Sequence, residues 1–236
     1  MTTERRSEPI EYAPGRLIDS YGPAAATTVL LWHGSGPNER EVLAPLATAV
    51  ADRGVRVLVP DWDSTSPDGG RADLLRSVKF AREGGAGSDS RLVVAGWSLG
   101  GTAAASLAIN ARKLGLDSVP AVCLAGAFGR TDPLSGQPFA SFEPSNRTPG
   151  SIRLLHGTQD DIVHIEGSRA FAKVLRSAGW EADLTELDTD HAGIVGAGFV
   201  ADRSRCIPSQ EPRVVKALEQ VVDVIVQATL PPQPRR

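Results

Sequence analysis

The stretch GWSLGG, residues 96–101, follows the apolar run LVVA at residues 92–95 and precedes the small-residue run TAAAS at residues 102–106. A serine on a tight turn between a strand and a helix adopts a strained backbone, and its neighbours two positions away must lack bulk. Gly96 and Gly100 meet that requirement around Ser98. The N-terminus of the following helix would direct backbone N–H groups toward Ser98 and stabilise a negative oxygen there.

A simpler interpretation of GWSLGG is a glycine-flanked turn whose serine caps a helix, since Ser is a common N-cap. A loose G-x-S-x-G match also arises often by chance. The context favours a nucleophile, because a strand, a turn and a helix of small residues occur in the order that the nucleophile elbow demands.

Apolar runs alternate with helical patterns along the rest of the chain, which predicts an α/β protein. The turn-forming sequence after residue 32 and Asn38, a potential N-cap, mark a helix start, and Gly54 marks its end. Strands that are apolar throughout and separated by helices form a mostly parallel sheet covered on both faces, with the ligand site at the carboxyl ends of its strands. The predicted strands are 27–32, 55–59, 91–95, 121–125, 152–155 and 182–187, and the predicted helices are 38–53, 71–82, 102–114, 165–178 and 212–227.

Composition bounds the organisation and the partners of the protein. A chain of 236 residues with 41% hydrophobic content fits one domain, which we place at 9–228, with disordered ends at 1–8 and 229–236. A net charge of -3 without a basic block argues against nucleic acid as a partner. Neither a signal peptide nor a membrane span is recognisable, so we expect a cytoplasmic protein. Cys123 and Cys206 form no metal-binding spacing and no disulfide framework.

The sequence resembles the α/β-hydrolase superfamily over most of its length, closest to its dienelactone-hydrolase-like and small carboxylesterase-like members. GWSLG at 96–100 is similar to the nucleophile elbow, HGSG at 33–36 to the oxyanion loop, and HGTQDDIV at 156–163 to the segment that carries the acid in many members. His191, in DHAG after the last predicted strand, matches the position of the family's histidine. The resemblance implies the α/β-hydrolase fold with a small or minimal cap, and a Ser-Asp-His chain order.

The chemistry of acyl transfer requires the same residue types. A serine hydroxyl needs a base within hydrogen-bond reach, and the base needs an acid that fixes its tautomer. We predict Ser98 as nucleophile and His191 as base, with His33 and His156 holding loop backbone and His164 exposed. The family's spacing favours Asp160 as the acid over Asp161, and loop roles are expected for Asp188 and Asp190.

The oxyanion would be held by two backbone N–H groups. One is that of Leu99, by the geometry of the elbow, and the other comes from the loop after residue 32. Ser35 is the first choice for the second donor, with Gly34 and Gly36 as alternatives, and Pro37 is excluded because it has no N–H. The alternative for this loop is an ordinary flexible turn.

The expected function is that of a serine hydrolase that cleaves ester-type bonds of small to medium substrates through an acyl-enzyme, with no cofactor and no metal. A thioesterase or a peptidase with the same triad stays open, and the chain is expected to be a monomer or a small homo-oligomer. A non-catalytic binding module is a second class of function. A dinucleotide-binding unit at Gly34–Gly36 is disfavoured, because Glu39 stands where its third glycine would be and Pro37 removes a donor.

Several residues near the expected site have two interpretations. Trp97 could line the substrate pocket, or it could pack beneath the elbow, which we favour. Asp61 could shape the pocket or bond a loop. Residues 128–150, rich in Pro, Ser, Gly and Thr, could form a short cap or an exposed loop, and the aromatic residues in this segment could wall the pocket or anchor the loop: Phe128, Phe139 and Phe142.

Overall fold

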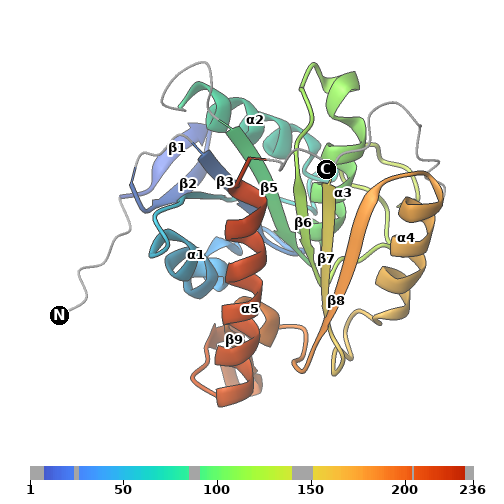
Figure 1. Ribbon diagram of the computed structural model, residues 1–236. Helices are drawn as coiled ribbons and strands as arrows, with labels where there is room; N and C mark the ends of the chain where they lie inside the picture. The colour runs from blue at the N-terminus through green and yellow to red at the C-terminus, as the bar shows by residue number, and fades with distance from the viewer. Residues whose placement is uncertain (1–7, 24–26, 85–90, 140–150, 204, 232–236) are drawn as a thin grey trace.

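The computed structural model describes residues 8–23, 27–84, 91–139, 151–203 and 205–231 (Figure 1). Its main sheet has eight strands in the order β1-β2-β4-β3-β5-β6-β7-β8. Strands β3 to β8 pair in parallel, and β1 and β2 add an antiparallel edge beside β4. The bounds of the strands are β1 Ile10–Ala13, β2 Arg16–Tyr21, β3 Thr27–Trp32, β4 Arg56–Pro60, β5 Arg91–Trp97, β6 Ala121–Leu124, β7 Ser151–Gly157 and β8 Glu181–Leu187.

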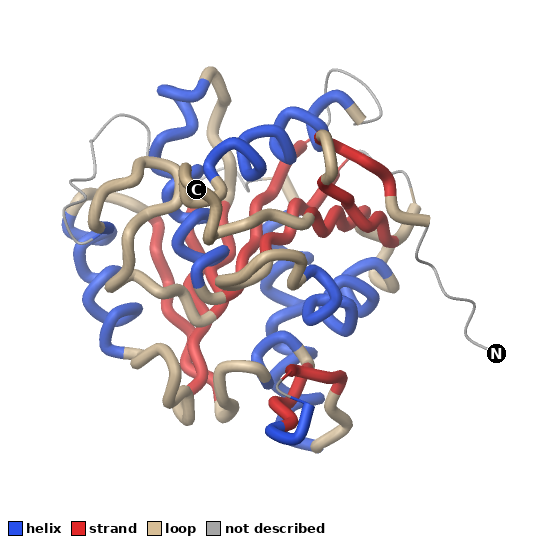
Figure 2. Tube along the Cα trace, turned by 180° about the vertical axis from the view of Figure 1, so that it is seen from behind, coloured by secondary structure: helices blue, strands red, loops and turns tan. Residues whose placement is uncertain are grey.

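Helices cover both faces of this sheet (Figure 2). On one face α2, α3 and α4 pack in a cluster with Leu30 and Trp32 of β3, and on the other α1 and α5 pack in a cluster with Val29 and Leu31. Side chains alternate between the faces of a strand, so a strand buried on both sides carries apolar residues on both faces, as β3 does from Val29 to Trp32. The helices are α1 Ala44–Ala51, α2 Arg71–Glu83, α3 Leu99–Asn110, α4 Glu166–Ser177 and α5 Pro212–Thr229.

The order of the strands places the candidate site. The chain leaves β3 toward β4 on one side and leaves β5 toward β6 on the other, so the connections diverge between β3 and β5. Ligands of open α/β sheets bind at such a switch point, beyond the carboxyl ends of the strands. The loop that begins at His33 follows β3, and Ser98 follows β5 directly.

The sequence misplaced two helix starts. Asn38 does not cap a helix: its φ is 58°, a left-handed turn conformation, and a 3-10 helix η1, Arg40–Leu43, precedes α1. α1 begins only where Pro45 can occupy the first turn, in which a missing N–H costs nothing. α3 begins at Leu99, three residues before the predicted start, because the helix grows directly out of the elbow. Its predicted end at Leu114 falls in a separate 3-10 helix, η2, Ala111–Leu114.

The structure adds two antiparallel elements that the sequence did not predict. One is the β1–β2 edge, and the other is a hairpin of β9, Ala197–Val200, and β10, Arg205–Pro208, which follows His191 and the 3-10 helix η4, Gly193–Val195. Within the described ranges no helix is long and apolar enough to cross a membrane. The predicted disordered segments 1–8 and 229–236 lie mostly outside the described residues, but α5 continues through Thr229.

Candidate active site

Ser98 occupies a strained turn between β5 and α3. Its φ of 56° and ψ of -120° are unusual for a residue with a side chain. Hydrogen bonds fix this conformation from both sides: the Ser98 N–H donates to Leu124 O at 2.9 Å, and the Ser98 carbonyl accepts from the N–H groups of Gly101 at 3.0 Å and Ala127 at 3.1 Å. The strain therefore persists because the adjoining helix and the loop after β6 both hold the turn.

The glycines around Ser98 are required by close backbone contacts. A Cβ atom at Gly96 would lie 2.1 Å from Gly100 O, and one at Gly100 would lie 2.3 Å from His33 O and 2.5 Å from Trp32 O. α3 thus packs against the end of β3 without a side chain between them. The clearance that the sequence suggested at Gly96 and Gly100 is the space in which strand and helix meet.

Asp160 and His191 come together from two loops at the carboxyl end of the sheet. His191 Nδ1 lies 2.7 Å from Asp160 Oδ2, and Asp160 Oδ1 accepts from the N–H groups of Ile162 at 3.0 Å and Val163 at 2.8 Å. Burial alone would raise the pKa of Asp160, but hydrogen bonds from His156, His191 and Val163 outweigh it and hold the pKa of this carboxyl well below its usual range. Asp160 is therefore an anion, and an anion at Oδ2 keeps the proton of His191 on Nδ1.

His156 supports the same carboxylate from behind. Its Nε2 lies 2.8 Å from Val163 O and 3.3 Å from Asp160 Oδ2, so Nε2 carries the proton. Nδ1 then accepts from the Ser168 hydroxyl at 2.7 Å. The sequence anticipated a histidine that holds loop backbone, and this one fixes the loop that carries Asp160.

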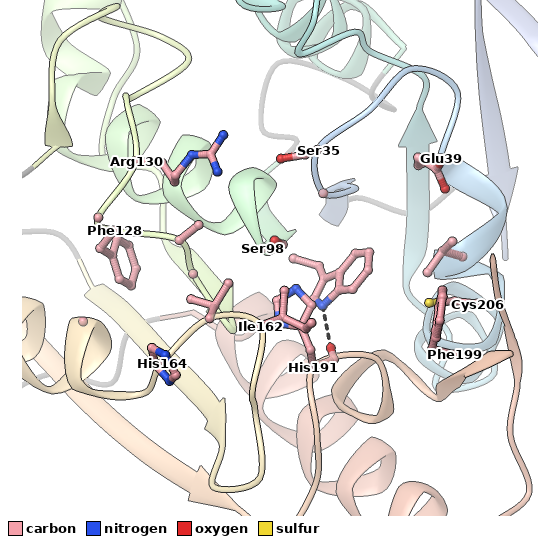
Figure 3. Close-up of a pocket in the computed structure, with 18 of the residues that line it drawn as sticks. Ser35, Glu39, Ser98, Phe128, Arg130, Ile162, His164, His191, Phe199 and Cys206 are labelled. Atoms are coloured by element: carbon pink, nitrogen blue, oxygen red, sulfur yellow. Dashed lines mark hydrogen bonds between the residues drawn. The ribbon is translucent and has the colours of Figure 1, made fainter. Parts of the chain in front are cut away.

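Trp97 connects the elbow to the histidine loop. Its Nε1 donates to His191 O at 2.8 Å, and its ring lies 5.0 Å from the His191 ring, centroid to centroid (Figure 3). Trp97 is 9% exposed and still lines the cavity around Ser98. Trp97 thus does what both interpretations of the sequence suggested, since it packs beside the elbow and contributes cavity wall.

Ser98 and His191 line one cavity of about 620 Å³, which we call the central cavity. Among the described side chains, Ser98 Oγ makes no hydrogen bond to the imidazole. Such contacts often tighten only when substrate binds. The structure brings Asp160 and His191 into contact and places Ser98 beside them.

The loop after β3 lies against the elbow. A Cβ atom at Gly34 would lie 3.2 Å from Ser98 Cβ, so the backbone passes directly beside the serine. The N–H of Gly36 donates to Ser64 Oγ at 2.9 Å and is already engaged, which disfavours Gly36 as a donor to substrate. Ser35 and Gly34 both line the central cavity. Leu99 is the first residue of α3, where an N–H has no partner within the helix.

Both ends of this loop are anchored. At the start, His33 Nε2 accepts from Trp62 N at 3.2 Å, and Trp62 Nε1 donates to His33 O at 3.2 Å. At the end, Arg40 donates to the buried Asp19 at 2.9 Å and also to Asp61. Asp61 is therefore a loop-bonding residue, the second of the two roles considered for it.

The central cavity has walls that the sequence did not suggest. Ile162, Val163 and His164 come from the loop after Asp160, and Phe199, Arg205 and Cys206 come from the β9–β10 hairpin. In Figure 3, Phe128, Ile162 and His164 lie on one side of Ser98, and Glu39, Phe199 and Cys206 lie on the other. No motif marks a hairpin after the histidine, so the pattern of residues 197–208 carried no usable signal.

The other aspartates considered as the acid have different surroundings. Asp188 accepts from Gln159 at 2.6 Å and Asp190 accepts from Gly193 N at 2.7 Å, so both have loop roles, and Asp161 is exposed.

The aromatic residues of the segment after β6 pack together. Phe128 lines the cavity and packs with Phe139 and Phe171 at ring distances of 5.3 and 4.3 Å, so Phe139 anchors the segment. Phe142 and the rest of the possible cap, 140–150, lie outside the described residues. Within the described ranges no group of three or more His, Cys, Asp or Glu side chains could hold a metal ion.

Comparisons with known proteins extend these observations. A model of the alpha/beta hydrolase family matches residues 29–229. No curated protein matches the sequence.

Solved structures resemble the chain over nearly its whole length. Esterase 2 of Thermogutta terrifontis with propionate bound is 18% identical, with 96% of each chain covered and a TM-score of 0.71. An esterase/lipase from an uncultured bacterium is 15% identical over 97% of this chain and 86% of its own, with a TM-score of 0.68. The Pyrobaculum calidifontis esterase is 19% identical over 91% and 82%, with a TM-score of 0.64. These likenesses confirm the fold that the sequence predicted.

Proposed function

Because this chain belongs to the alpha/beta hydrolase family, we propose that it is a serine hydrolase that cleaves carboxylic esters of small molecules. The observation that carries the proposal is the hydrogen bond of 2.7 Å between His191 Nδ1 and the ionised Asp160, beside a strained Ser98 in the same cavity. His156 also faces Asp160 but is fully buried, whereas His191 lines the cavity that contains Ser98. The esterases of similar fold are consistent with this chemistry.

In the proposed first step, Ser98 Oγ attacks the ester carbonyl and His191 Nε2 takes the proton. The Asp160 carboxylate keeps Nδ1 protonated, which leaves the lone pair on Nε2, and it stabilises the imidazolium that forms. His191 then gives the proton to the departing alcohol, and an acyl-enzyme remains. Water repeats the sequence: it loses a proton to His191, attacks the acyl carbon and releases the acid and Ser98.

The negative oxygen of each tetrahedral intermediate needs donors fixed in advance. We assign this role to the backbone N–H of Leu99 and of Ser35. Leu99 begins α3, whose dipole adds positive potential, and Ser35 belongs to a loop anchored by Trp62 and Arg40. Loss of one such donor lowers the rate about 10²- to 10³-fold in comparable sites. Gly34 is the alternative second donor.

The proposal is tested with a fluorophosphonate probe and a short 4-nitrophenyl ester. The wild-type protein should be labelled and should release 4-nitrophenolate, and Ser98→Ala should do neither. His191→Ala should lower turnover by about 10³-fold or more, because the serine loses its base. Circular dichroism verifies that both variants are folded. Turnover that persists in folded Ser98→Ala would show that another nucleophile acts, and a protein that neither reacts nor hydrolyses would favour the binding-module alternative.

The bond type is tested with matched ester, thioester and aminoacyl substrates. We expect esters to give the highest kcat/KM. A thioester or anilide preference would leave the triad in place and change the substrate class, because all three substrates pass through the same acyl-enzyme.

A further inference from the structure

Arg130 stands on a segment that is fixed relative to the nucleophile. Three residues before it, the N–H of Ala127 donates to Ser98 O at 3.1 Å, and the Arg130 N–H donates to Ala127 O at 3.0 Å. The Arg130 carbonyl accepts from the Phe139 N–H at 3.2 Å, which closes the turn. The backbone of Arg130 is therefore tied to the elbow through a short chain of hydrogen bonds.

Arg130 borders two cavities. It lines the central cavity with Ser98 and His191, and it also lines a second cavity of about 450 Å³, which we call the side cavity. In Figure 3 the guanidinium points from the β6 side toward Ser35, and it lies on the opposite side of Ser98 from His191. An extended substrate in the central cavity would pass this cation.

The guanidinium of Arg130 forms no hydrogen bond or ion pair within the part of the chain that the structure describes. The two carboxylates of the side cavity are occupied by other donors. Asp68 accepts from the N–H groups of Gly70 and Ala72, and Asp132 accepts from the Ser106 hydroxyl at 2.6 Å and the Leu134 N–H at 2.9 Å.

The two cavities differ in charge. Asp68 and Asp132 outnumber Arg130 around the side cavity, so that cavity repels anions. Among the residues that line the central cavity, Arg130 and Arg205 are cations and Glu39 is the single carboxylate, whereas the Asp160 anion contacts His191 and does not line the cavity. A negative ligand group is therefore favoured on the face of Arg130 that looks toward Ser98.

We propose that Arg130 binds an anionic group of the substrate in the central cavity, so that the preferred esters of this enzyme carry a carboxylate. A guanidinium presents paired donors that match a carboxylate in a bidentate arrangement. The inference rests on the proposed ester hydrolysis and specifies its substrate class. A phosphate group offers similar oxygens, and the experiment separates the two anions.

The experiment compares two charged esters with their neutral counterparts. One pair is 4-nitrophenyl hydrogen succinate and its methyl ester, with the charge on the acyl part. The other is 3-acetoxybenzoate and its methyl ester, with the charge on the leaving group. In the wild-type protein, kcat/KM for the charged member of at least one pair should exceed that of the neutral member by about 10- to 100-fold. Succinate should inhibit competitively more strongly than inorganic phosphate does.

Arg130→Gln should remove this preference, so that the ratio of kcat/KM for the charged and neutral members of the pair falls to about 1, while Arg130→Lys should keep part of it. Arg205→Gln is the matched control, since Arg205 is an exposed cation on the hairpin side of the same cavity, and it should keep the preference. Added NaCl should weaken the wild-type preference, because screening weakens exposed charge pairs.

The proposal is overturned if the wild type prefers neither charged ester, or if Arg205→Gln loses the preference and Arg130→Gln keeps it. Stronger inhibition by phosphate than by succinate would overturn the assignment of a carboxylate. These outcomes differ from failure of the proposed function, in which the neutral esters are not hydrolysed at all. In that case, calorimetric titration of succinate into Ser98→Ala and into Ser98→Ala/Arg130→Gln still tests the anion site.

Discussion

At the residue scale, the site requires glycines at positions where a Cβ atom would not fit. Gly96, Gly100 and Gly34 lie where a Cβ atom would meet backbone or the side chain of Ser98. Ser98 keeps a left-handed φ because three neighbouring segments bond to its N–H and its carbonyl. Strain of this kind costs about 1–3 kcal/mol and persists only where the surroundings impose it.

Gly100→Ala tests this close packing. The new methyl would lie 2.3 Å from His33 O and 2.5 Å from Trp32 O. Both oxygens belong to the backbone, so the contact can be relieved only if α3 or the end of β3 shifts. We expect a loss of about 1–3 kcal/mol or more in unfolding free energy, measured by urea denaturation, together with reduced turnover. Gly129→Ala is the control, because a Cβ atom there meets nothing within 4 Å. Equal unfolding free energies of the two variants would show that the backbone around residue 100 accommodates a methyl group at little cost.

His33 gives the protein a component of acid sensitivity. Burial lowers the pKa of His33 to about 4, whereas an unfolded histidine titrates near 6.5. Between these two values the unfolded chain takes up a proton that the folded state refuses, so stability falls as the pH drops from about 6.5 to about 4. At neutral pH neither state carries the proton, and this loss is absent.

We expect His33→Gln to lack this component. The difference in unfolding free energy between wild type and variant should narrow by up to about 3 kcal/mol from pH 7 to pH 4. Urea denaturation at several pH values measures it, and the NMR shift of the His33 ring follows the titration directly. A ring that titrates near 6.5 in the folded protein would contradict the prediction.

At the scale of elements, the strands of the parallel sheet and the long helices were predictable, and the β1–β2 edge and the β9–β10 hairpin were not. The stretches VLLW of β3 and VVAGW of β5 are apolar because both faces of these strands are buried there, and that pattern is visible in the sequence. β1 and β2 mix exposed with buried positions and contain polar residues such as Glu11, Arg16 and Asp19, so they carry no such pattern. The start of α1 was misplaced because Asn38 is equally suited to an N-cap and to the left-handed turn that it adopts.

In the site too, residues within local sequence motifs were predictable, and residues on irregular segments were not. Ser98, Asp160 and His191 each follow a strand within a short recognisable motif, and the structure places them around one end of the sheet. Arg130, Ile162 and Phe199 line the cavity from irregular segments, and their position depends on long-range packing that no local pattern encodes. Gly36 is likewise distinguished from Gly34 and Ser35 only by a contact 28 residues away, that of its N–H with Ser64.

The β9–β10 hairpin should influence the substrate more than the fold. Phe199 is 65% exposed and lines the central cavity, so its ring has few partners until a substrate covers it. For Phe199→Ala we expect the unfolding free energy to change by less than about 0.5 kcal/mol. KM for esters with longer apolar chains should rise about 3- to 10-fold, with acetate esters little affected.

Initial rates over a series of 4-nitrophenyl esters measure this effect. Leu230→Ala is the matched control, because Leu230 is 58% exposed and does not line the central cavity. A uniform rise in KM across all chain lengths would argue that the hairpin acts on the site as a whole and has no direct contact with the chain.

At the scale of the whole molecule, the two apolar clusters share their strands. Leu30 belongs to the cluster under α2, α3 and α4, and its neighbour Leu31 belongs to the cluster under α1 and α5. If the shared strands unfolded, the apolar side chains of both clusters would be exposed to water. The candidate site lies at the end of the same strands, so its geometry depends on both layers.

Truncation of either leucine should therefore lower one common unfolding transition. Leu30→Ala and Leu31→Ala each remove a fully buried side chain and should each cost about 2–5 kcal/mol. Urea curves followed by tryptophan fluorescence, far-ultraviolet circular dichroism and ester hydrolysis should coincide in each variant, since a single cooperative transition moves all probes together. Val174→Ala, at a 43% exposed position on α4, should leave the midpoint almost unchanged. Leu31→Ala could instead produce two separate transitions, in which the tryptophans of the Leu30 cluster unfold at the wild-type midpoint. The two layers would then be independent units. In that case the geometry of the site would not depend on both faces of the sheet.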